Sequence, residues 1–108
     1  MNKWKVIVDS YEMGDDIVLM LRGGEKFHIG AVAMATPYKN TASTSIISSY
    51  GHKEGDLVKP LAEKVAKRLK KTVVLVAGLH IDNATQDDIQ KLVENSNNVI
   101  DDFLEGFN

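Results

Sequence analysis

Residues 73–80 read VVLVAGLH, and this stretch decides the fold. Val73 to Ala77 are apolar at every position, which is typical of a central strand covered on both faces of a sheet. Gly78 predicts the end of that strand, and His80 follows just past it. A strand this apolar needs neighbouring strands and covering helices, which the rest of the sequence must supply.

Two segments upstream predict further apolar strands. Ile17 to Leu21 is apolar at five consecutive positions and stops at Arg22-Gly23-Gly24, which predicts an interior strand ended by a Gly-Gly turn. His28 to Ala35 predicts a third strand from its small and branched residues. Pro37 is expected to close this strand, because proline has no N–H to donate to a ladder.

Two more segments complete the predicted strands. Trp4 to Val8 alternates imperfectly between apolar and polar residues, and residues 11–16 contain the turn formers Gly14 and Asp15. Thr41 to Ser49 has β-branched residues that suit a strand, while its many hydroxyls leave much of it polar.

The spacing of apolar residues predicts one helix before the central strand. It is expected to begin near Gly55 or Asp56, with Asp56 as its cap, and Pro60 would then fall within the first four positions. Lys67, Arg68, Lys70 and Lys71 suit its solvated last turn. Its apolar stripe consists of Leu57, Val58, Leu61, Val65 and Leu69.

A second helix is predicted after the central strand. Thr85 is its expected cap, and Asp87 and Asp88 place negative charge in its first turn. Asn95 to Asn98 is a weak patch where fraying or a kink is expected. Its apolar face consists of Ile89, Leu92, Val93, Ile100, Phe103 and Leu104.

These elements predict a single α+β domain over residues 1–108. The order is four strands, helix, strand, helix, with a mostly antiparallel sheet of about five strands and two amphipathic helices. Several strands are apolar on both faces, yet only two helices can cover them. Either the helices lie on opposite faces, or a second chain buries the remaining face. We therefore expect a homodimer or a heteromer.

The composition limits the function. The 108 residues carry a net charge of −2 and no block of like charge, which gives no footprint for nucleic acid. The absence of cysteine excludes disulfides and thiolate chemistry, and no apolar run is long enough to span a membrane. With no signal-peptide pattern, we expect a cytoplasmic protein.

The three histidines, His28, His52 and His80, all lie where the chain is expected to change direction. If the sheet brings these points together, the imidazoles could bind a metal, hold a phosphate or move protons. Half-buried, hydrogen-bonded histidines at strand ends are the simpler interpretation. The helical zinc pattern and the nucleophile elbow are both absent, so the chain is more plausibly not an enzyme.

The residues before the first helix could hold an anion. His52 and Lys53 precede its first turn, where free backbone N–H groups favour a phosphate, and the hydroxyls of Ser48 and Ser49 would add donors. An ordinary solvated helix start explains the same residues. Gly23-Gly24 fits no phosphate-loop pattern and is expected to be a turn.

Three segments stand out in this order: residues 23–33 (GGEKFHIGAVA), Thr44-Ser45 followed by residues 51–54 (GHKE), and residues 73–82 (VVLVAGLHID). Together they resemble the LpdD-like family of prenylated-flavin chaperones, small partners of UbiD-type phenolic acid and gallate decarboxylases. The resemblance covers about residues 15–104.

The resemblance implies a non-catalytic role: assisting delivery of prenylated FMN to a UbiD-type decarboxylase, or maturation of that enzyme. Prenylated FMN or FMN would bind transiently, its phosphate at the helix start and its ring on the Ala/Val/Met strand face. The alternatives are a histidine-based metal- or phosphate-binding protein or small hydrolase, and a purely structural subunit. The candidate flavin-binding residues are His28, Gly30, Ser49, His52, Lys53 and His80.

Overall fold

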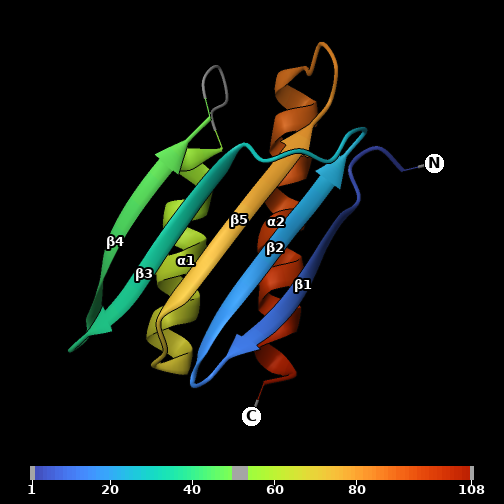
Figure 1. Cartoon of the computed structure of the whole chain (residues 1–108). Helices are drawn as coiled ribbons and strands as arrows, with labels where there is room; N and C mark the ends of the chain where they lie inside the picture. The colour runs from blue at the N-terminus through green and yellow to red at the C-terminus, as the bar shows by residue number, and fades with distance from the viewer. Residues whose placement is uncertain (1, 50–53, 108) are drawn as a thin grey trace.

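The computed structural model describes residues 2–49 and 54–107. The order of its elements confirms the predicted order of four strands, helix, strand and helix, and the α+β class (Figure 1). The elements are β1 (Val6–Met13), β2 (Asp16–Gly24), β3 (Ala31–Tyr38), β4 (Thr41–Ser48), α1 (Gly55–Leu69), β5 (Val73–His80) and α2 (Gln86–Glu105).

Across these residues the strands form a five-stranded sheet in the order β1-β2-β5-β3-β4. β5 is central, as predicted, and pairs in parallel with β2 and antiparallel with β3. The other pairs, β1 with β2 and β3 with β4, are antiparallel. The predicted end of β5 at Gly78 is wrong, because β5 continues to His80 along β2.

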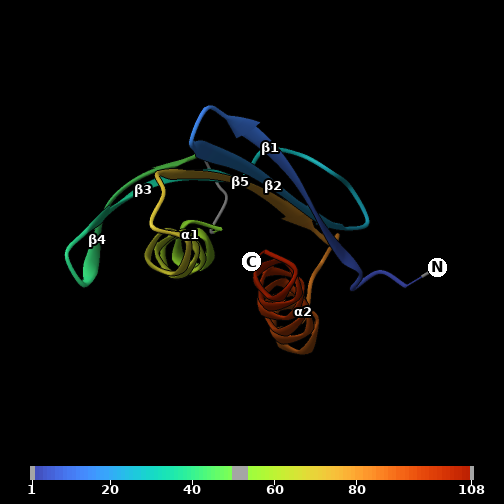
Figure 2. The ribbon, with the colours of Figure 1, turned by 90° about the horizontal axis from the view of Figure 1, so that it is seen from below.

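Both helices lie on the same face of the sheet (Figure 2). They bury alternate residues of the central strands, and α1 contributes the buried stripe that its spacing predicted. Because the helices share one face, no helix or strand of the described residues covers the opposite face of the sheet. The largest fully buried apolar side chains are Leu19, Leu21, Leu61, Leu75, Ile100, Val58, Val65 and Val73.

Three predicted strand ends are wrong. β1 continues through residues 11–13, because these pair with β2 as far as Met13↔Asp16, and the turn is confined to Gly14 and Asp15. Gly23-Gly24 is the end of β2 and not a turn. Pro37 lies inside β3, where it is tolerated because β5 pairs with β3 only as far as Ala35.

The predicted cap of α1 is also wrong. The N-cap is Glu54, so Pro60 is the sixth helical residue and lies beyond the first turn. Its missing N–H leaves the carbonyl of Asp56 without its usual intrahelical donor. Both residues are exposed, so water can satisfy that carbonyl.

α2 runs without interruption from Gln86 to Glu105, so the kink expected at residues 95–98 is absent from it. Ser96 is fully buried and its Oγ donates to the carbonyl of Leu92 (2.7 Å). Asn95 Nδ2 donates to the carbonyl of Trp4 (2.7 Å). These polar residues therefore fit the helix through contacts that helix propensity does not include.

The predicted cap of α2 is confirmed and extends into a network with the N-terminal segment. Thr85 and Asp88 form a capping box, and Trp4 Nε1 donates to Asp88 Oδ1 (2.8 Å). Lys3 Nζ lies 3.3 Å from the same oxygen. Hydrogen bonds from the Thr85 backbone and from Trp4 lower the pKa of this buried carboxyl well below its usual range.

This pKa shift predicts how stability depends on pH. A lowered folded-state pKa stabilises the fold above the unfolded pKa of about 3.9, and the effect is lost as pH falls below it. Asp88→Asn should lower stability at pH 7 and flatten its decline between about pH 5 and pH 3. Denaturant titrations over this range test this. Asp87→Asn, an exposed control, should retain the wild-type pH dependence.

Gly78 provides a second stability test. A Cβ at this position would overlap the carbonyl oxygen of His28, which is backbone and cannot rotate away. Gly78→Ala should therefore lower the free energy of unfolding by about 2 kcal/mol or more. Gly106→Ala is the control, because its Cβ would make ordinary contacts, and it should change stability by less than about 0.5 kcal/mol. If chemical denaturation shows that both variants lower the free energy of unfolding equally, the close approach of the Gly78 and His28 backbones is wrong.

Candidate functional site

A segment between β2 and β3, residues 25–30, crosses the C-terminal end of β5. The N–H groups of Glu25 and Gly30 donate to the carbonyls of His80 (2.7 Å) and Ala77 (2.8 Å). At Gly78 the crossing backbone comes so close that only a glycine fits without displacement. This crossing brings the rings of His28 and His80 together, with centroids 5.6 Å apart and planes at 81°.

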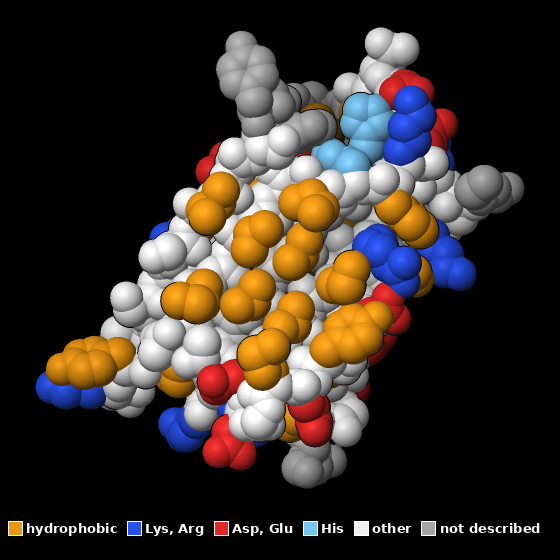
Figure 3. All heavy atoms as spheres, in the orientation of Figure 1, with side chains coloured by type: hydrophobic (Ala, Val, Ile, Leu, Met, Phe, Trp, Pro, Cys, Tyr) orange, Lys and Arg blue, Asp and Glu red, His pale blue; other side chains and the backbone are white. Residues whose placement is uncertain are grey.

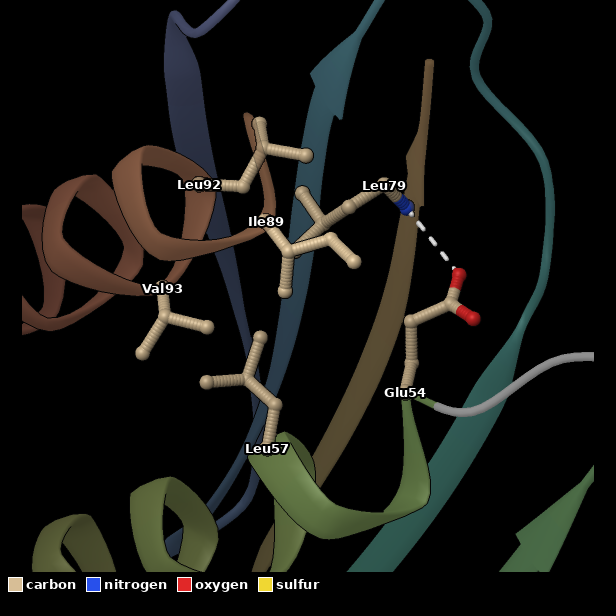
Figure 4. A pocket seen from close by; sticks show the side chains of 6 residues that line it. All are labelled: Glu54, Leu57, Leu79, Ile89, Leu92 and Val93. Atoms are coloured by element: carbon tan, nitrogen blue, oxygen red, sulfur yellow. Dashed lines mark hydrogen bonds between the residues drawn. The ribbon is translucent and has the colours of Figure 1, made fainter. Parts of the chain in front are cut away.

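Glu54 connects this crossing to the start of α1. Its Oε2 lies 3.0 Å from His28 Nε2 and accepts a hydrogen bond from the Leu79 N–H (3.2 Å; Figure 4). β3 pairs with β5 only up to Ala77, so this carboxylate takes the acceptor position that β3 would otherwise fill. The side chains of His28 and Glu54 are only 22% and 11% exposed.

His80 forms a more exposed pair. Its Nε2 lies 2.8 Å from Asp82 Oδ1, and the Asp82 N–H donates to Glu25 Oε1 (2.9 Å). The hydrogen bond from His80 and the nearby charge of Lys26 lower the pKa of the Asp82 carboxyl. Two histidine–carboxylate pairs therefore lie side by side at this end of the sheet, one nearly buried and one in contact with solvent.

The other candidate residues lie at this end in different ways. A Cβ on Gly30 would overlap the Glu54 carboxylate, so Gly30 gives that side chain its room. The Ser49 N–H donates to the Gly30 carbonyl (2.8 Å). His52 and Lys53 lie outside the described residues. Within the described part of the chain, no group of three or more side chains could hold a metal ion.

A hollow of about 390 Å³ opens on the uncovered face of the sheet beside His28. Its lining is almost entirely apolar, apart from His28 and Arg22, and its size lies in the range of roughly 300–1,000 Å³ that suits small-molecule sites. Arg22 forms an ion pair with Asp9 and lies over the Phe27 ring (5.3 Å). The lining residues are Val18, Met20, Leu21, Arg22, Phe27, His28, Ile29, Val76 and Gly78.

A smaller cavity, about 160 Å³, lies on the helix side. Figure 4 shows its apolar side chains from α1, α2 and β5, with Glu54 at the margin. It is smaller than most small-molecule sites, so the hollow on the open face is the better candidate for a flat ring. Its lining residues are Glu54, Leu57, Leu79, Ile89, Leu92 and Val93.

A family model described as the prenylated flavin chaperone LpdD-like domain matches residues 1–108. The chain belongs to this LpdD-like family. A search of curated proteins finds no match. Neither helix in the described residues is long and apolar enough to cross a membrane.

The strand face predicted to contact the flavin ring includes alanines that the structure buries. The alanines of β3, Ala31, Ala33 and Ala35, are buried toward the helices, so they cannot contact a ligand. The accessible face of this LpdD-like domain carries Val32 and Met34 instead. A strand read as apolar on both faces gives no indication of which face the helices will cover.

The candidate site residues predicted from the sequence do not include Glu54, Arg22 or Asp82. Glu54 had a detectable signal, because an acidic residue beside a predicted helix start is favoured by the helix dipole. Its reach to His28 and Leu79 depends on tertiary contacts between segments about 25 residues apart. No local pattern in the sequence encodes these contacts.

The Glu54–Leu79 hydrogen bond can be tested through amide exchange. Glu54→Leu removes the acceptor, so the Leu79 amide should exchange at least about tenfold faster, while neighbouring β5 amides stay protected. Glu54→Gln keeps a carbonyl oxygen and should preserve most of this protection. Amide-resolved hydrogen exchange by NMR measures both variants. Similar Leu79 rates in both would show that Glu54 is not the acceptor.

Proposed function

We propose that this LpdD-like protein is a non-catalytic chaperone that assists delivery of prenylated FMN to a UbiD-type decarboxylase, or the maturation of that enzyme. The observation that carries the proposal is the family match over residues 1–108. The match supports a role with prenylated flavin, and the partner enzyme follows from the resemblance of the three histidine-bearing segments.

The hollow on the open face supports a direct contact with the flavin ring. Val18, Met20 and Val76 form an apolar floor, and Phe27 and Ile29 are exposed residues at its side. A flat, largely apolar ring gains by leaving water at such a surface. His28, at the edge of the hollow, could donate to or accept from the polar edge of the ring.

The phosphate would bind at the start of α1 in this proposal. Ser48 Oγ lies against Gly55 at that start, and His52 and Lys53 precede it in the sequence. A phosphate dianion is favoured there by the free N–H groups and the positive end of the helix dipole. The helices cover the face opposite the hollow. One flavin would therefore have to extend around the 25–30 segment to place its ring in the hollow and its phosphate at the start of α1.

The test is a fluorescence titration of the purified protein with FMN and with prenylated FMN. We expect saturable binding of prenylated FMN. His52→Ala/Lys53→Ala should weaken binding about tenfold or more, because hydrogen bonds to a charged phosphate contribute more than neutral ones. Ile29→Asp should weaken binding by placing a charge beside the ring.

Lys67→Ala/Arg68→Ala is the matched control, because it removes two basic residues from the opposite end of α1. It should bind like the wild type. If folded protein binds neither flavin, direct flavin binding is wrong, and a role through the decarboxylase alone would have to be tested by pull-down. If the control variant weakens binding as much as His52→Ala/Lys53→Ala, the effect is one of overall charge and not of a phosphate site.

A further inference from the structure

The uncovered face of the sheet is the largest feature of the molecule that the flavin proposal leaves unexplained. Figure 3 shows hydrophobic side chains gathered over this face, with charged side chains mostly at its margins. The strand registers place alternate residues of all five strands on it. Its apolar members are Ile7, Tyr11, Met13, Val18, Met20, Val32, Met34, Tyr38, Ile47, Val74 and Val76.

We propose that a second copy of this chain packs against this face, sheet against sheet, to form a symmetric dimer. The first argument is burial. Met34 is 48% exposed and Ile47 is 75% exposed in the single chain, and each lies beside Val32 on this face. Both helices are already used on the other face, so no described element of this chain can cover these side chains.

The second argument is area. Five strands of eight or nine residues, at about 4.8 Å between strands and about 3.3 Å per residue, give a face of roughly 650 Å². Two such faces would bury roughly 1,300 Å² together, which is within the range of stable protein interfaces.

The third argument is charge, and it favours a second copy over a different protein. Asp9 and Arg22 lie within the face and form an ion pair with each other, and Asp16 lies on the same face at its margin, at the start of β2. A face with so little net charge has no requirement for a partner of opposite charge. It is therefore compatible with an identical face, as a two-fold symmetric interface requires.

The geometry of the face also suits sheet packing. Stacked sheets lie about 10 Å apart with interdigitating side chains, and valine and methionine of the central strands are of suitable length for this spacing. The dimer would have helices outside and two sheets inside. The hollow beside His28 belongs to the same face, so the second copy would form its outer wall.

The experiment uses sedimentation velocity on flavin-free protein from 1 to 100 µM, so its result is independent of flavin binding. We expect a dimer at tens of micromolar. Met34→Glu should weaken dimerisation at least about 100-fold, because the dimer would bury two like charges without partners. Ile47→Glu, at a more exposed position, should also weaken it.

Ile89→Glu is the matched control, because Ile89 is 45% exposed but lies on α2, away from the sheet face. Its dimer affinity should stay within about threefold of the wild type. Circular dichroism and thermal unfolding confirm that each variant is folded. A wild-type monomer at 100 µM overturns the proposal, as does a dimer that survives both sheet-face substitutions or is lost equally in Ile89→Glu.

Discussion

The position of β5 between β2 and β3 is the constraint on which the rest of the structure depends. β5 follows β3 in the sequence after residues 39–72 and follows β2 after a longer interval, and it can enter between them only if β2 and β3 are left apart. The chain meets this requirement with the 25–30 segment, which leaves β2 and passes over the end of β5 to reach β3. The same insertion makes the β2–β5 pair parallel and sets α1 as the crossover that precedes it.

The histidine end of the molecule is a consequence of this crossing. Two backbones can approach closely at Gly78 and Gly24 because neither residue has a side chain there, and a Cβ on Gly24 would overlap the His80 backbone. His28 and His80 are then held on adjacent segments, and Glu54 reaches His28 from the start of α1. The geometry that allows β5 to be central therefore also builds the candidate site.

The sequence predicts the elements well because their signals are local. Apolar runs, the stripe of α1 and the Thr85 cap each depend on a few neighbouring residues, and all three are present in the structure. The errors occur where contacts with segments distant in the sequence determine where a strand ends. β5 continues past Gly78 because β2 pairs with it there, and Pro37 stays in β3 because β5 has already ended its pairing. Of the expected convergence of three histidines, the described residues show that of His28 and His80. The contacts of Glu54 could not be expected from the sequence.

An open, shallow hollow is well suited to a protein proposed to pass a cofactor on to another. Affinity rises with the fraction of a ligand that is enclosed, and enclosure also slows release. A flat ring bound in the hollow beside His28 would be covered on one side and accessible on the other. Within a dimer, the second copy would enclose that other side, so separation of the two copies would expose the cofactor for transfer. Dimerisation through the sheet face would then control both how tightly the flavin is held and when it is released, without any change within the fold of a single chain.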